Sequence, residues 1–307
     1  MITSRAITTL GYTSRNWSQI VWADTLNLFV AVAANGSATG TNTMTSPDGL
    51  TWTGNVGVIG RAWSGLAWSS ELGLLVAVST QGSVMTSTDG ITWTLQTITP
   101  VGIWGKVAWS PRLGLFVAVG GDVDNDVIMT SPDGVTWTAR TSPPAITGWA
   151  DVAWSEHLKL FAIVKFYEGN PIIAVSPDGI TWTPQVAPIA PTTFGRIVYG
   201  GPGNGSFLAH AADGSVITSE KGTDWIMQES PGVAAFGSLA WSDYLQVFVA
   251  GPQLPETAFL ASHDGSMFEQ VHDVTTAGTF NATAWSPTLR RFATVGSFSV
   301  IATVELV

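Results

Sequence analysis

The sequence predicts an all-β fold made of seven copies of one four-strand unit, and two observations carry this prediction. The first is a pair of aromatic residues, five positions apart, that occurs seven times along the chain. The second is the spacing between copies, 41 to 46 residues, which suits a four-stranded propeller blade and is too long for leucine-rich or ankyrin repeats. We therefore expect a seven-bladed β-propeller of four-stranded blades, with residues 1–307 as a single domain. The pairs are Trp17/Trp22, Trp63/Trp68, Trp104/Trp109, Trp149/Trp154, Phe194/Tyr199, Phe236/Trp241 and Phe280/Trp285.

The third repeat shows the strands of one unit most clearly. We expect its four strands over residues 104–108, 113–120, 127–131 and 135–140. The second of these is almost continuously apolar, which indicates burial on both faces of the strand. Blades that stack face to face around an axis bury their second strands in this way.

A turn motif separates the third and fourth strands in six repeats. Its most regular form is Ser-Pro-Asp-Gly, with a Trp three residues after the Gly. Pro presets the backbone, Asp accepts backbone N–H groups, and Gly takes the left-handed conformation of the turn. We assign its acidic residues to stability alone: Asp48, Asp89, Asp133, Asp178 and Asp264.

This motif resembles the Asp-box, or BNR, repeat of sialidase-like propellers, whose pattern is Ser-x-Asp-x-Gly-x-x-Trp. Asp and Gly are adjacent in this chain, so the match is to a shortened form, and Lys221 replaces the acid in the fifth repeat. The resemblance implies a propeller in which the box is a folding element on the face away from the ligand.

The seventh repeat has room for only three strands before the sequence stops at Val307. The spacing of the other repeats places its missing fourth strand in the alternating segment 2–10. We therefore expect the N-terminal strand to close the last blade, which removes both edges of the ring.

Composition limits the classes of partner. The net charge is −10 with only 12 basic residues, so we expect neither nucleic-acid binding nor attraction to anionic membranes. No segment has the apolar length of a membrane span, and residues 1–10 do not resemble a signal peptide. We expect an extracellular or virion-associated location without a signal peptide, and a cytoplasmic one stays open; the absence of cysteine decides neither.

A ligand site is expected where the innermost strands begin, because ligands of propellers usually meet that face. Aromatic side chains there could stack on sugars, and the alternative is that they pack between blades. A charged trio from three consecutive repeats, Lys106, Asp151 and Arg196, could bind a polar ligand or form a plain ion-pair cluster. The aromatic candidates for ligand binding are Trp17, Trp63, Trp104 and Trp149.

One loop carries acids at alternating positions, Asp122, Asp124 and Asp126, a spacing that can gather oxygen ligands for Ca²⁺. A solvated acidic loop is the alternative. We expect no other cofactor.

Catalysis is not expected. Sialidases need an arginine trio, a Tyr–Glu pair and an Asp. No Arg-Ile-Pro stretch appears near the start of this sequence, and Tyr167 and Glu168 are neighbours in one loop, which does not suit a cooperating pair. The arginines that could reach the ligand side are Arg15, Arg61, Arg140 and Arg196. Other glycosidases need two carboxylates across a cleft, and nothing ties Asp151, Glu168 and Asp122 together.

The sequence therefore predicts a recognition or structural module that binds glycans or a cell-surface receptor. Its composition resembles that of repeat-containing structural proteins of bacteriophage particles, such as tail, fibre or decoration components. Two alternatives stay open: an assembly protein that docks on another protein without binding sugar, and a divergent glycoside hydrolase of sialidase-like fold.

Overall fold

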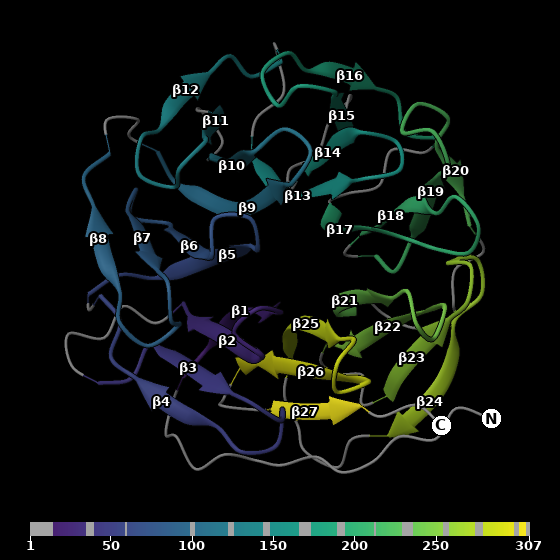
Figure 1. Ribbon diagram of the computed structural model, residues 1–307. Coiled ribbons are helices and arrows are strands. Elements are labelled where there is room, and N and C mark those ends of the chain that lie inside the picture. The colour runs from purple at the N-terminus through teal and green to yellow at the C-terminus, as the bar shows by residue number, and fades with distance from the viewer. Residues whose placement is uncertain are drawn as a thin grey trace.

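A computed structural model describes residues 15–34, 40–58, 60–98, 102–121, 126–143, 148–165, 173–188, 194–211, 213–228, 236–253, 258–273, 279–297 and 301–304. Its strands form seven antiparallel sheets arranged in a ring (Figure 1). The described residues contain no α-helix, and hence no helix that could cross a membrane. The prediction of an all-β, seven-bladed propeller is confirmed. Whether residues 1–307 form one domain stays a prediction.

Blades are numbered 1 to 7 in chain order, and the strands of each described blade follow one another from the centre outward, four in blades 1 to 6 and three in blade 7 (Figure 1). The first strands are β1 (Trp17–Ala23), β5 (Trp63–Ser69), β9 (Trp104–Ser110), β13 (Trp149–Ser155), β17 (Phe194–Gly200), β21 (Phe236–Ser242) and β25 (Phe280–Ser286). The second strands are β2 (Leu28–Ala33), β6 (Leu74–Ser79), β10 (Leu115–Gly121), β14 (Leu160–Lys165), β18 (Ser206–Ala211), β22 (Val247–Pro252) and β26 (Arg291–Gly296).

The third strands are β3 (Thr43–Ser46), β7 (Val84–Ser87), β11 (Asp126–Ser131), β15 (Ile173–Ser176), β19 (Val216–Ser219), β23 (Ala258–Ser262) and β27 (Ile301–Val304). The fourth strands are β4 (Thr53–Asn55), β8 (Thr94–Gln96), β12 (Thr138–Arg140), β16 (Thr183–Gln185), β20 (Ile226–Met227) and β24 (Glu269–Asp273). Each first strand begins at the leading aromatic residue, as the sequence predicted. β12 begins three residues later than expected, because residues 132–137 form the box turn.

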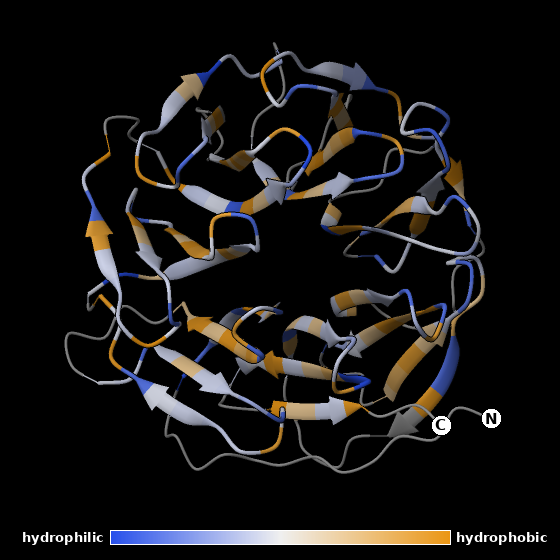
Figure 2. Ribbon diagram, viewed as in Figure 1, coloured by the Kyte–Doolittle hydropathy of each residue, from blue (hydrophilic) through white to orange (hydrophobic). Residues whose placement is uncertain are grey.

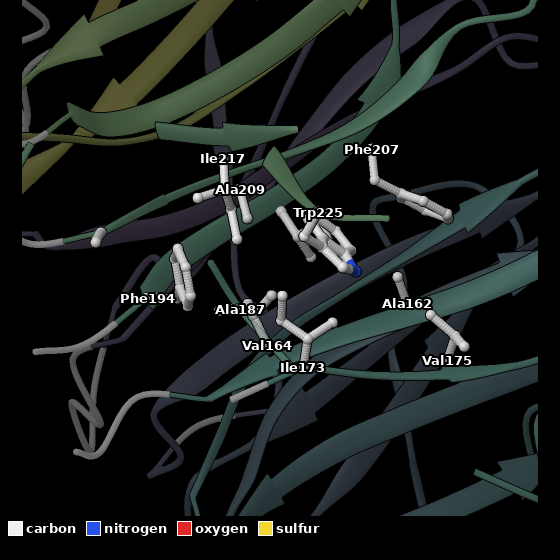
Figure 3. Close-up of a cluster of buried hydrophobic side chains, with 12 residues drawn as sticks. Ala162, Val164, Ile173, Val175, Ala187, Phe194, Phe207, Ala209, Ile217 and Trp225 are labelled. Atoms are coloured by element: carbon white, nitrogen blue, oxygen red, sulfur yellow. The ribbon is translucent and has the colours of Figure 1, made fainter. Parts of the chain in front are cut away.

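Packing between neighbouring blades makes the core. Each leading aromatic side chain lies against the second and third strands of the preceding blade, so that Phe194 of β17 meets Val164 and Ile173 of blade 4 (Figure 3). The second strands are buried on both faces, as their apolar runs predicted. Figure 2 shows hydrophobic residues along strands such as β2 and β26, and a mixture of hydrophilic and hydrophobic residues in the turns. Apolar burial between blades therefore provides the main stabilisation.

A β-bulge follows the leading aromatic in the first strand of each blade. The bulge turns the next side chain toward the following blade. Ser64 donates from its hydroxyl to the main-chain oxygen of Trp104 at 2.6 Å, and Ser18 donates to that of Trp63 in the same way. These bonds link the starts of consecutive inner strands.

The shortened Asp box forms the hydrogen bonds that its residue types predict. In the first copy, Asp48 Oδ1 accepts the backbone N–H groups of Leu50 and Thr51 at 2.8 and 2.7 Å. Gly49 has φ +74° and donates its N–H to the Ser46 hydroxyl oxygen at 2.8 Å. The same pattern recurs around Asp89, Asp133 and Asp178, and Asp264 makes a partial version.

In the fifth box, where Lys221 replaces the acid, Asp224 supplies one of its contacts, the bond to the Ser hydroxyl. Its Oδ1 accepts the Ser219 hydroxyl at 3.0 Å, and its Oδ2 forms an ion pair with Lys221 Nζ at 3.3 Å. The turn therefore still contains a carboxylate, although Lys221 stands at the acidic position of the motif.

The seventh sheet contains three strands, β25, β26 and β27, in the described part of the chain. The expected fourth strand, residues 2–10, lies outside the described residues, so its pairing stays a prediction.

Candidate functional site

The four tryptophans expected to stack on sugars are buried. Their exposed fractions are 0% for Trp17 and Trp63, 1% for Trp104 and 3% for Trp149. A sugar platform needs an accessible ring face, and these rings are covered by the preceding blade. Of the two possibilities that the sequence left open for these side chains, stacking on sugars and packing between blades, the structure shows packing between blades.

Lys106 of the charged trio is buried, and its ammonium group is engaged by the protein itself. Nζ donates to Gln19 Oε1 at 2.7 Å and to the main-chain oxygen of Ser64 at 2.9 Å. The main chain at Lys106 can lie this close to β5 because residue 65 is glycine: a Cβ there would lie 2.8 Å from Lys106 Cα. Burial first, and then repulsion from Arg196, lowers the pKa of Lys106 well below 10.5, against the attraction of Asp151.

Asp151 and Arg196 are likewise directed at the backbone. Asp151 accepts the N–H groups of Val152 and Ile197 at 2.9 and 3.2 Å, and Arg196 Nη2 donates to the main-chain oxygen of Asn281 at 2.6 Å. Burial raises the pKa of Asp151 although Arg196, Lys106 and these N–H groups oppose the shift. No ion pair joins these three described side chains. They fasten inner strands to one another, and a ligand role for them stays a prediction.

His210 on β18 is a second buried polar group, at a position where five other blades carry valine. Neither ring nitrogen has a hydrogen-bond partner, and the ring packs edge-on against Phe236 with centroids 5.2 Å apart. Burial first, and then repulsion from Arg196, lowers its pKa to about 3. The imidazole is therefore a neutral core group at physiological pH.

The structure leaves most of the proposed calcium loop undescribed. Asp122 and Asp124 lie outside the described residues, and Asp126 begins β11. Among the described residues, no three or more His, Cys, Asp or Glu side chains gather as a metal site would require. Calcium binding stays a prediction. Tyr167 and Glu168 also lie outside the described part of the chain.

Two adjoining pockets lie on the face that carries the Asp boxes and the turns between first and second strands; we call this the box face. The first pocket, of about 370 Å³, is walled by Trp154, Tyr199 and Trp241 from blades 4, 5 and 6. The second, of about 410 Å³, reaches Glu220 and Lys221 of the fifth box turn. Both include His157, Asn204 and Gly205. Together they form one depression, which we call the blade-5 groove.

A departure from the repeat accounts for this groove. In the other six blades the turn between first and second strands has a Leu followed by a residue with φ between 51° and 58°. In blade 5 the corresponding left-handed residue is Gly205, and Asn204 stands in the place of Leu. The turn is also one residue longer, because Gly200 pairs with Ser206 where Ser155 pairs with Leu160. The groove includes the position that Leu occupies in the other turns. Those leucines are Leu26, Leu72, Leu113, Leu158, Leu245 and Leu289.

A second departure brings Trp241 to the groove. Six blades have Ser or Ala directly after the second aromatic, and blade 5 has Gly200. A Cβ on Gly200 would lie 2.2 Å from Trp241 Cγ, so the glycine lets the indole rest against the backbone of blade 5. The Tyr199 hydroxyl donates to the main-chain oxygen of Asn204 and fixes the long turn.

Carboxylates flank the aromatic walls. Trp154 Nε1 donates to Glu156 Oε2 at 2.8 Å, and Trp241 Nε1 donates to Asp243 Oδ1 at 2.5 Å. These contacts satisfy the indoles and hold both carboxylates beside the groove. The groove thus combines fixed aromatic surface with negative charge.

Sequence reasoning missed the groove because it placed ligands on the opposite face. A signal was present: the run Gly-Gly-Pro-Gly-Asn-Gly over residues 200–205 breaks a turn that is otherwise regular. In a repeat protein, such a break in one copy marks a place where the surface differs from its neighbours.

No protein-family model matches the chain, and no curated protein matches its sequence. Solved structures do resemble it. The structure of YCF48 bound to a D1 peptide has a TM-score of 0.72 at 16% identity, over 98% of this chain and 99% of that one. YCF48 from Cyanidioschyzon merolae has a TM-score of 0.70 at 16% identity, with the same coverage. A chain of the mitotic checkpoint complex has a TM-score of 0.73 at 12% identity, over 99% and 91%. At these identities the likeness shows the fold alone.

Proposed function

We propose that the protein is a non-catalytic recognition module that holds a segment of a partner protein in the blade-5 groove. The observation that carries this proposal is the groove itself, an accessible depression walled by Trp154, Tyr199 and Trp241. Tryptophan and tyrosine side chains are enriched at protein-binding sites, where they often contribute most of the binding energy.

A peptide is favoured over a larger folded surface by the shape of the groove and by one similar structure. The two pockets share His157, Asn204 and Gly205, so a short segment of chain can contact both. YCF48, which has a similar fold, has been solved with a D1 peptide bound. That structure supports a peptide as the kind of ligand a propeller of this form can hold, and says nothing of the sequence bound here.

Glycan binding is the competing hypothesis. Its original candidates, the leading tryptophans, are buried, whereas the rings of the groove are half-buried and could stack on a sugar. A cell-surface receptor and a place on a virion stay predictions from composition. The hydrolase alternative has lost Asp151 as a candidate acid, because that carboxylate is buried and bonded to backbone N–H groups.

The test is a selection of random twelve-residue peptides on the purified protein, run beside a glycan array. Asn204→Leu serves as counter-selection, since it restores the residue that the other blades carry and removes the amide of Asn204 from the lining of both pockets. We expect peptides that bind the wild type and lose binding to Asn204→Leu.

Two results would overturn the proposal. Glycans that bind the wild type and not Asn204→Leu would make the groove a sugar site. Peptides that bind both proteins equally would place recognition elsewhere on the molecule.

A further inference from the structure

The charge around the blade-5 groove points to the chemistry of its occupant. Glu156 and Asp243 stand beside the first pocket, and Glu220 lines the second. Lys221, also in the second pocket, is neutralised by its ion pair with Asp224 at 3.3 Å. The groove therefore has an excess of negative charge, in keeping with the net charge of −10 of the chain.

We propose that the blade-5 groove binds a cationic side chain, Arg or Lys, from an extended basic segment of the partner protein. This inference rests on the proposed function and names the ligand chemistry of the same site. The cation enters the pocket between Trp154, Tyr199 and Trp241, where ring faces and carboxylates both favour positive charge.

The carboxylates are held in place yet keep bonding capacity. Glu156 and Asp243 each use one oxygen to accept an indole N–H. A carboxylate has two oxygens and several acceptor sites, so either group can accept a further hydrogen bond from a guanidinium or ammonium. Because the indoles fix their positions, little side-chain entropy is lost when the cation binds.

The box face already contains a contact of this kind. The Arg290 guanidinium, in the turn after β25, lies 4.4 Å from the ring centroid of Tyr244, in the turn after β21. An arginine of blade 7 therefore stacks on an aromatic ring of blade 6 from the same set of turns. At the blade-5 groove the aromatic rings face a pocket instead, and the partner supplies the arginine.

An extended segment fits the arrangement of the two pockets. They adjoin through His157, Asn204 and Gly205, so a chain that crosses Asn204 reaches both. Side chains two apart on an extended strand lie about 7 Å from each other on one face. Cations spaced two residues apart can thus enter the first pocket and meet Glu220 in the second.

The test uses a synthetic probe, acetyl-Gly-Arg-Gly-Arg-Gly-amide, and the same peptide with citrulline in place of arginine. Citrulline keeps the shape and the hydrogen-bonding end of the side chain but removes its charge. Dissociation constants are measured by calorimetry at constant ionic strength for the wild type and for the double variant Glu156→Gln, Asp243→Asn. Both changes preserve an oxygen for the indole N–H, so the protein should stay folded.

The chain offers a matched control on the same face. Asp24 and Glu71 accept the indole N–H groups of Trp68 and Trp109 at 2.7 and 2.8 Å, in turns where the leucine is present. The double variant Asp24→Asn, Glu71→Gln therefore changes net charge by the same amount and neutralises the same kind of indole-bonded carboxylate without touching the groove.

We expect the arginine peptide to bind the wild type and the control variant alike, and to bind the groove variant about tenfold more weakly, as for the loss of a charge pair. The citrulline peptide should bind the wild type about tenfold more weakly as well. If both double variants lose the same affinity for the arginine peptide, the peptide is attracted by the overall negative charge of the protein, and the proposal is overturned. Equal binding of both peptides, or of neither, would also overturn it. The proposed function fails separately, if the peptide selection returns no groove-dependent binder or the glycan array returns a groove-dependent sugar.

Discussion

Asn281 of β25 donates from Nδ2 to the main-chain oxygen of Trp17, 2.8 Å away and 264 positions earlier in the sequence. Ser18 and Ser64 make the same kind of contact: in these three blades the polar side chain directly after the leading aromatic donates to the main-chain oxygen of the leading aromatic of the next blade. Blade 7 is thereby fastened to blade 1 at the centre of the ring. Asn281 Nδ2 also donates to Asn16 Oδ1 at 2.7 Å.

We predict that Asn281→Ala lowers the free energy of unfolding by about 1–2 kcal/mol, because the main-chain oxygen of Trp17 loses a partly buried donor. Asn55→Ala is the control, since Asn55 bonds only within blade 1. Urea unfolding measures both. If both variants lose the same free energy of unfolding, the contact between blades 7 and 1 stabilises the protein no more than a contact within one blade does.

His210 provides a second prediction, on pH. Its folded-state pKa is about 3 and its ordinary value 6.5, so between these values the unfolded chain binds a proton that the folded protein does not. Stability therefore falls as pH drops from 6.5 toward 3. At pH 5 the cost of this one group is about 2 kcal/mol.

We expect His210→Val to remove this cost, since valine stands at the same place in five other blades. The variant should gain stability at pH 5 relative to pH 7 when compared with the wild type by urea unfolding. A difference between the two proteins that does not change with pH would show that His210 is not held neutral in the core.

The Asp boxes predict a separate, more acidic transition. Burial opposes ionisation of Asp133, but the N–H groups of Thr136 and Val135 and the Ser131 hydroxyl outweigh it and lower its pKa. A lowered folded-state pKa contributes stability that is present above the ordinary value of 3.8 and lost as pH falls below it. Asp48, Asp89 and Asp178 are shifted in the same direction by equivalent contacts.

Asp133→Ala should accordingly lower the melting temperature at pH 7 and leave peptide binding unchanged, because the third box lies away from the blade-5 groove. Differential scanning calorimetry at pH 7 and pH 3 measures the first effect, which should shrink at pH 3. Loss of binding with an unchanged melting temperature would contradict the assignment of the boxes to stability.

The architecture could be predicted because the repeat encodes it redundantly. Every blade carries its own leading aromatic, and each of the seven, from Trp17 to Phe280, marks the first residue of an inner strand. The site could not be found in this way. The regular pattern that identifies the fold does not distinguish one blade from another. The groove depends on two departures in blade 5: residue 204 is Asn where the other turns have Leu, and residue 200 is Gly.

The burial of individual tryptophan side chains is the second property that could not be predicted from the sequence. Trp63 and Trp68 are the same residue type, five positions apart on one strand, yet the first is fully buried and the second half-buried. The bulge after Trp63 and the blade stacked against it decide the difference. Neither feature can be predicted from residue type.

Binding in the blade-5 groove can be tested most directly by an NMR titration of protein labelled with ¹⁵N at its 15 tryptophans. A peptide from the selection is added, and the indole N–H signals are assigned by single substitution to Phe. If the peptide binds in the blade-5 groove, the signals of Trp154 and Trp241 shift while those of Trp22 and Trp68, on the same face, do not. Shifts confined to the leading residues Trp17, Trp63, Trp104 and Trp149 would contradict it and return the binding site to the opposite face.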